Sequence, residues 1–175
     1  DDLDVRNMAC EKACAILGVK STTHFGLPDN CLDTVPFIEI VQLLEQVMTE
    51  LVPNVVYTHH YGDLNIDHRI CNQAVLTACR PTPGASVSEI YSFEVFSSTE
   101  FSAPGVLSFN PNVFVDISSY LQSKMAALAE YALEMREVPH SRSIAHVISL
   151  SEHRGNSMGM LNAEGFMLLR KIKCK

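Results

Sequence analysis

The stretch that decides the fold is Tyr57-Thr-His-His-Tyr-Gly-Asp-Leu-Asn-Ile-Asp-His-Arg69, a polar cluster between two apolar patterns. Residues 55–57, which lead into the cluster, are Val-Val-Tyr and predict a short buried strand. After the cluster, apolar residues recur at helical spacing from Ile66 to Ala78, which predicts a helix. Ligands of open α/β sheets bind outside the carboxyl ends of the strands. The cluster is therefore the candidate binding site.

Hydrophobic periodicity on both sides of the cluster predicts alternating helices and strands. We expect helices at residues 4–17, 34–51, 66–78, 121–135 and 143–153, and strands at residues 21–25, 55–58, 86–95, 113–117 and 163–170. Gly18 is expected to end the first helix and Thr34 to cap the second. The strand, long helix and strand over residues 21–58 have the order of a parallel crossover unit. We therefore predict an α/β fold, a three-layer sandwich with a mostly parallel, Rossmann-like sheet.

Length and composition favour one ordinary globular domain that covers residues 1–175, since 47% of the residues are hydrophobic. The formal net charge of −7, without a Lys/Arg run, argues against a nucleic-acid partner. No apolar run approaches the roughly 20 residues of a membrane span. We expect a cytoplasmic protein and leave a homo-oligomer open. None of the six cysteines has zinc-ribbon spacing, so they are expected to be reduced: Cys10, Cys14, Cys31, Cys71, Cys79 and Cys174.

The Asp67-His68 pair at the start of a helix suits metal or acid/base chemistry. Imidazole and carboxylate are zinc ligands, and a zinc site with an open position activates water. One such pair also occurs as a structural helix cap, so the residues alone leave both interpretations open.

The run from Thr58 to Arg69, together with Ala78-Cys-Arg-Pro81, resembles the second metal motif of the PIG-L/LmbE-like deacetylases. Members of this family are zinc-dependent enzymes that remove acetyl groups from N-acetylglucosamine-type sugars. The resemblance extends over nearly the whole chain through Arg6, Leu17-Gly18, Phe25-Gly-Leu-Pro-Asp-Asn30, Val138-Pro-His-Ser-Arg-Ser143 and Ala163-Glu-Gly-Phe166. It implies an LmbE-like fold, one divalent zinc ion per subunit and a small amino-sugar substrate.

The resemblance also implies roles for single residues. His68 would be a metal ligand, with Asn65 or His140 supporting the oxyanion and Asp67 orienting His68 or capping its helix. Substrate contacts would come from Arg6, Asp63 and His60, with Glu164 behind the site. Structural or solvent-exposed alternatives stay open for Arg6, His60, His140 and Glu164, and Asp63 could instead hold its loop. His59 could be structural, and His24, His146 and His153 have no motif around them.

The family's first motif, Ala-His-Pro-Asp-Asp-Glu, supplies two further metal ligands and the general base, and it does not occur in this sequence. We expect it upstream of Asp1, with the first strand-helix unit, and expect the 175 residues by themselves to be inactive. The predicted function is removal of an acetyl group from an N-acetylated amino sugar or glycoconjugate. The alternative is a non-catalytic sugar- or nucleotide-binding module, a degenerate relative of the family. The sequence identifies neither the acetylated sugar nor the oligomeric state.

Overall fold

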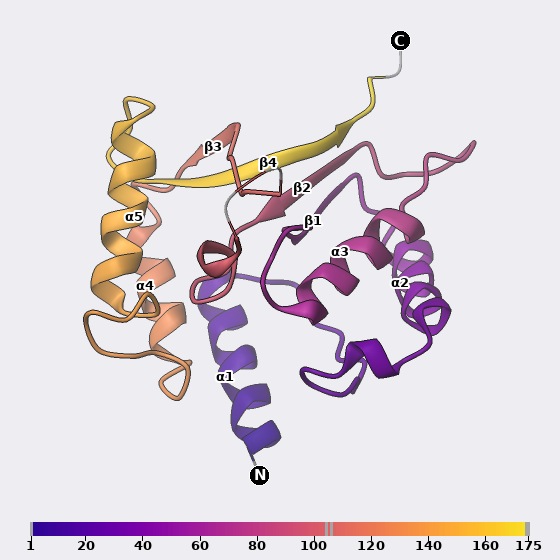
Figure 1. Cartoon of the computed structure of the whole chain (residues 1–175), viewed down its shortest axis with the longest axis horizontal. Helices are drawn as coiled ribbons and strands as arrows, with labels where there is room; N and C mark the ends of the chain where they lie inside the picture. Colours follow the sequence, from indigo (N-terminus) through magenta and orange to yellow (C-terminus); the bar gives the residue numbers. More distant parts are fainter. Residues whose placement is uncertain (1, 104, 106, 174–175) are drawn as a thin grey trace. The chain divides into compact units, whose positions relative to one another are not determined.

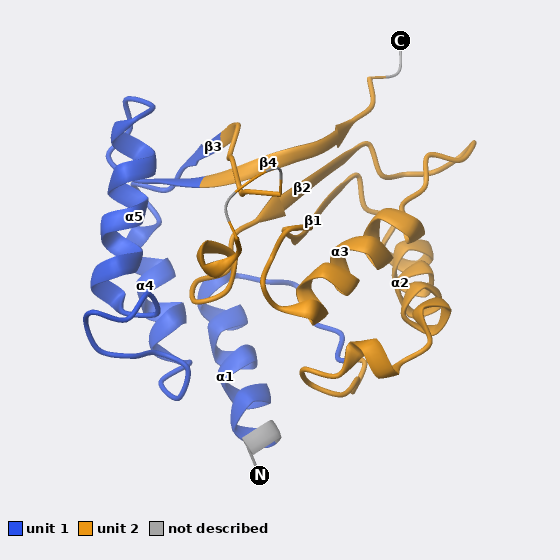
Figure 2. Cartoon of the chain, viewed as in Figure 1, with its two compact units in different colours: residues 1–24, 114–164 blue, residues 25–113, 165–175 orange. Residues whose placement is uncertain are grey.

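The computed structural model describes residues 2–103, 105 and 107–173, so Cys174 lies outside the described residues. Figure 2 shows two compact units, each built from separate stretches of the chain. Unit 1 comprises residues 1–24 and 114–164, and unit 2 comprises residues 25–113 and 165–175. That one domain covers residues 1–175 stays a prediction.

The strands of the described residues form one four-stranded sheet in the order β1-β2-β4-β3 (Figure 1). These strands are β1 (Val55–His59), β2 (Glu89–Phe93), β3 (Val113–Asp116) and β4 (Ala163–Lys171). Strands β1 and β2 are parallel, with Val55 opposite Glu89, whereas β4 runs antiparallel to β2. The α/β class is thus confirmed, but the expectation of a mostly parallel sheet is corrected to a mixed one. The physical reason is that pairing sets the direction of a strand: helices separate β2 from β4 in sequence, and β4 returns to pair with β2 in the opposite direction.

Helices α2 (Phe37–Leu51) and α3 (Ile66–Ala78) pack against each other in unit 2. One buried apolar cluster joins them to the 3₁₀ helix η1 (Leu32–Thr34) and contains Leu32, Ile40, Val41 and Ala74. A second cluster joins α3 to the sheet and contains Val75, Cys79, Val87 and Ile90. Because α3 connects the parallel strands β1 and β2, the crossover unit of this chain is β1-α3-β2. The crossover unit expected at residues 21–58 is not formed.

Three local predictions are corrected. Residues 21–25 are irregular and largely exposed, because no described strand pairs with them. Thr34 does not cap α2 but lies in η1, where its hydroxyl donates to the carbonyl of Cys31. The N-cap of α2 is Pro36. The helix expected at residues 121–135 is shorter and ends at Ala129, as α4 (Leu121–Ala129). Tighter turns replace it from Glu130, whose N donates to Ala127 O.

Unit 1 contains α1 (Asp2–Leu17), α4 and α5 (Ile144–Asn156). The small buried side chains Ala9 and Ala13 allow α1 to pack on α4. Gly18 ends α1 as predicted, with φ of 69°, while Val19 N donates to Cys14 O. No helix in the described part of the chain is long and apolar enough to cross a bilayer.

Candidate functional site

The loop from β1 into α3 carries most of the polar cluster and is held by its own side chains. Asn72 Nδ2 donates to the carbonyl of His59 at 2.8 Å, which ties α3 to the end of β1. Arg69 Nη1 donates to the carbonyls of Asp63 at 2.7 Å and Leu64 at 2.8 Å. These contacts satisfy backbone carbonyls at the end of β1 and in the loop that follows it. They place His68, on the first turns of α3, beside the carboxyl end of β1.

Asp63 lies at the centre of this loop, and only 1% of its surface is exposed. Its carboxylate accepts hydrogen bonds from Asn65 N at 2.9 Å and Thr99 Oγ1 at 2.6 Å, and from the hydroxyl of Ser98. Burial by itself would raise the pKa of Asp63, but the groups around the carboxylate, His68 foremost, hold the pKa far below its usual range. Asp63 is therefore a buried, ionised carboxylate at neutral pH.

His68 faces that carboxylate, with Nδ1 3.1 Å from Oδ1 of Asp63. The two atoms are within ion-pair distance, although their alignment does not meet hydrogen-bond geometry. The ring of His59 stacks on the ring of His68, with centroids 4.2 Å apart and an interplanar angle of 20°. Burial, followed by the nearby His68, lowers the pKa of His59 to about 4. His59 is thus neutral at pH 7 and adds no positive charge beside His68.

This arrangement fits a metal ligand. A ligating histidine commonly turns its other ring nitrogen toward a carboxylate, which fixes the tautomer and the ring orientation. Because Nδ1 of His68 faces Asp63, Nε2 is the nitrogen left for a metal, and 19% of the side chain is exposed. Among the described residues, no group of three His, Cys, Asp or Glu side chains converges on one point. His68 can therefore supply one ligand of a larger set.

The structure places Asn65 and Asp67 in structural contacts. Asn65 is the N-cap of α3: its Oδ1 accepts from Asp67 N at 2.8 Å, and its Nδ2 donates to Asn30 Oδ1 at 3.2 Å. Asp67 accepts from Leu32 N at 3.0 Å and so ties η1 to α3. The carboxylate beside His68 is Asp63 rather than Asp67. A catalytic role for Asn65 stays a prediction, and the amide has a second N–H that the hydrogen bond to Asn30 does not use.

His60 is fully buried and lies behind the loop. Its Nε2 donates to the carbonyl of Leu107 at 2.6 Å, and its ring meets Phe109 edge-on at 5.4 Å. Gly62 makes this approach feasible, because an added Cβ would stand 2.1 Å from Leu107 O and 2.9 Å from His60 Nε2. This burial supports a structural part for His60, and its predicted substrate contact stays untested.

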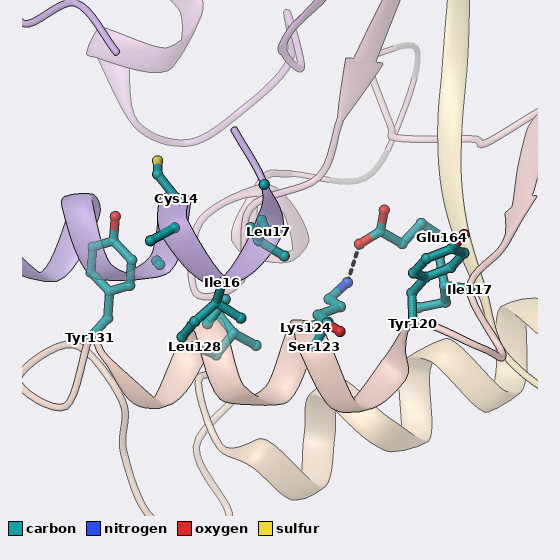
Figure 3. Close-up of a pocket in the computed structure, with 14 residues that line it drawn as sticks. Cys14, Ile16, Leu17, Ile117, Tyr120, Ser123, Lys124, Leu128, Tyr131 and Glu164 are labelled. Carbon is teal, nitrogen blue, oxygen red and sulfur yellow. Dashed lines mark hydrogen bonds and ion pairs between the residues drawn. The ribbon is translucent and has the colours of Figure 1, made fainter. Parts of the chain in front are cut away.

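The three remaining candidates belong to unit 1. Glu164 forms an ion pair with Lys124, drawn as a dashed line in Figure 3. His140 is exposed, and its Nδ1 accepts from Arg142 N at 3.0 Å. Arg6 is half-buried on the first turns of α1. Their predicted roles in catalysis and substrate binding stay predictions.

Ser98 and Thr99 were not expected in the site. They follow the end of β2, and both hydroxyls reach Asp63 although about 35 positions separate them in sequence. Thr99 Oγ1 also accepts from Val95 N at 2.7 Å, which fixes the hydroxyl. The available signal was the Ser97-Ser98-Thr99 run directly after a predicted strand, at the same sheet end as the cluster.

Sequence comparison relates the chain to deacetylases. Residues 2–79 match the sequence model of the family described as PIG-L, GlcNAc-PI de-N-acetylase. The uncharacterized deacetylase YaiS of Escherichia coli K12 is 28% identical over 137 residues, which make up 75% of this chain and 67% of that protein. The family match contains the whole loop around Asp63 and His68.

Solved structures share the fold. The N,N'-diacetylchitobiose deacetylase of Pyrococcus horikoshii, solved with an inhibitor, matches with a TM-score of 0.74 and 18% identity over 95% of this chain and 64% of that chain. GalB of Pseudomonas putida, a 4-carboxy-2-hydroxymuconate hydratase, matches with a TM-score of 0.74 and 20% identity over 98% of this chain and 74% of that chain. At these identities the matches show an LmbE-like fold and do not select a reaction.

Proposed function

We propose that the protein is a metal-dependent deacetylase of an N-acetylated amino sugar or glycoconjugate, since residues 2–79 match the PIG-L family and a deacetylase is 28% identical. The observation that carries the proposal is the contact between His68 and the buried, ionised Asp63. A polar residue this deeply buried needs its partners, and here they orient an imidazole at the carboxyl end of a strand.

In the proposed reaction His68 binds a divalent metal, zinc by the chemistry of the family, through Nε2. A bound zinc ion supplies Lewis-acid polarisation of the acetamide carbonyl and a water of lowered pKa. Asp63 holds the imidazole ring in one orientation and strengthens it as a ligand through its negative charge. Ser98 and Thr99 keep Asp63 from rotating toward the substrate.

Further groups complete the proposal. We keep Arg6 as a substrate contact and His140 as a group that supports the oxyanion, each on the family resemblance alone. His68 would be one ligand of the metal, and the family resemblance implies two further ligands and a general base.

The fold by itself leaves other reactions open, because a hydratase shares it. The family match across the loop that holds His68 supports a deacetylase reaction, in addition to the contact between His68 and Asp63. A non-catalytic sugar- or nucleotide-binding module is the alternative, and it differs from an enzyme in one measurable respect, the release of acetate.

The test is acetate release from N-acetylglucosamine derivatives by the full-length protein, with and without a chelator. We expect acetate release that the chelator abolishes. In His68→Ala the rate of acetate release should fall by at least about 100-fold, because a ligand of the catalytic metal is removed. His24→Ala, at an exposed histidine of the other unit, is the matched control and should keep the activity. Sugar binding without acetate release would contradict the proposal and favour the binding module.

A further inference from the structure

Two cysteines on α1 lie side by side. Cys10 and Cys14 are one helical turn apart, and their Sγ atoms are 4.0 Å from each other. Both side chains are half-buried, and both residues carry free thiols. The face they share is next to the buried Ala9 and Ala13, on the side of α1 that packs on α4.

This separation suits a single tetrahedral metal ion. Two thiolates about 2.3 Å from one tetrahedral zinc ion stand about 3.8 Å apart, close to the distance observed here. A disulfide fits less well, because side chains four residues apart on a helix have Cβ atoms about 5–6 Å apart, whereas a disulfide needs about 3.5–4.5 Å. A metal ion can therefore bridge the two thiols without opening α1, and oxidation cannot.

The cavity beside Cys14 leaves room for an ion and its remaining ligands, and Cys10 is not among the residues that line it. Cys14 lines a cavity of about 700 Å³ between α1 and α4, and Figure 3 shows it with Tyr131 at one end of the hollow. Burial, followed by a hydrogen bond with Cys10, raises the pKa of Tyr131 to about 12. The phenol stays protonated at neutral pH and can donate to a thiolate.

We propose that Cys10 and Cys14 form a second metal site, which binds one thiophilic divalent cation of the zinc and cadmium class across a turn of α1. Each thiol gives up its proton to solvent as its metal–sulfur bond forms, and the cavity admits water to the other coordination positions. The bound ion links two successive turns of α1, so it stabilises the helix that packs on α4. This site uses no residue of the His68 loop.

The experiment is a titration of the full-length protein with Cd²⁺, followed by the ultraviolet charge-transfer band of cadmium–thiolate bonds. We expect a saturable band with one equivalent, and its loss in Cys10→Ser and in Cys14→Ser. Cys71→Ser is the matched control, since Cys71 is also half-buried on a helix, and it should keep the band. His68→Ala should keep the band as well, so this result is independent of the proposed deacetylase site.

A thermal unfolding measurement accompanies the titration. In the His68→Ala background, which removes the other proposed metal site, one equivalent of Cd²⁺ should raise the Tm, and it should leave the Tm unchanged once Cys10→Ser/Cys14→Ser is added. A circular dichroism spectrum shows that each variant is folded, and Cys10→Ala/Cys14→Ala replaces any serine variant that is not. A band that survives in a folded double variant, or a wild type without a saturable band, would overturn the proposal.

Discussion

Asp63 accepts hydrogen bonds from three partners and faces His68, so a change of this one side chain acts on both stability and metal binding. Asp63→Asn keeps the size but places an NH₂ group among donors. We expect a loss of about 1–3 kcal/mol in the free energy of unfolding, from buried polar groups left unsatisfied. Metal affinity should fall by about 10–100-fold, because the group behind the ligand is changed.

Chemical denaturation and metal competition measure these two effects. Asp33→Asn is the matched control, since Asp33 is an exposed carboxylate in the same unit. Equal behaviour of the two variants would show that the Asp63 network does not hold the site.

Gly62 has no room for a side chain. In Gly62→Ala the new Cβ would meet the backbone oxygen of Leu107 and the ring of His60, both of which are held by their mutual hydrogen bond. Overpacking of this kind typically costs about 1–3 kcal/mol, and we expect that loss in chemical denaturation. An unchanged free energy of unfolding would mean that the loop relaxes at no cost, and that His60 does not fix it.

The sequence predicted which residues form the polar cluster better than it predicted which side chains contact one another there. The run around Asp63 and His68 indicated a candidate site, because so many polar residues at a helix start are unusual for a simple cap. Which carboxylate faces His68 depends on how the loop folds back, and it is Asp63 rather than Asp67. Ser98 and Thr99 come from another strand end, and only the paired sheet brings them to Asp63.

The N-terminus of α3 is the element that positions His68, and Asn65 caps it. Asn65→Ala should lower the free energy of unfolding by about 1 kcal/mol, whereas Asn65→Asp should keep it, because aspartate also accepts from Asp67 N. Ser143→Ala is the matched control for stability, because it also removes a side-chain N-cap, that of α5 in the other unit.

Acetate release by the two Asn65 variants separates the two roles of this residue. If Asn65 acts only as a cap, Asn65→Asp keeps the activity of the full-length protein. If its amide donates to an oxyanion, Asn65→Asp is folded and stable but loses about 10²–10³ in kcat.

Helices with a strong hydrophobic period were predictable from the sequence, whereas strands that depend on pairing with a neighbouring strand were not. The stripe of α2 and the apolar positions of α3 gave helices close to the observed bounds. Residues 21–25 are rich in strand-forming types but have no described neighbour to pair with. The direction of β4 depends on the strand beside which it lies, which hydrophobic pattern does not encode.

Metal binding at His68 should raise the free energy of unfolding of the whole molecule. A ligand that binds only the folded state at about 100 times its Kd adds about 2.7 kcal/mol to the free energy of unfolding. In the Cys10→Ser/Cys14→Ser background, which removes the second proposed site, a chelator should lower the Tm of the full-length protein. The same chelator should have no effect once His68→Ala is added, and an equal shift in both proteins would place the stabilising metal elsewhere.

The family match and the fold support different conclusions about the reaction of the whole molecule. The match over residues 2–79 relates the chain to deacetylases, whereas solved structures with the same fold include a hydratase as well as deacetylases. The reaction therefore depends on His68, Asp63 and their contacts rather than on the sheet and helices.

We propose His68 as a metal ligand, and the metal content of the protein tests this role most directly. The measurement is the zinc stoichiometry of full-length protein in the Cys10→Ser/Cys14→Ser background, compared with the same protein carrying His68→Ala or His24→Ala. We predict about one zinc ion per subunit in the parent and in His24→Ala, and a loss of bound zinc in His68→Ala, because a site with about three protein ligands does not tolerate the removal of one. Stoichiometric zinc in a folded His68→Ala variant would contradict the account.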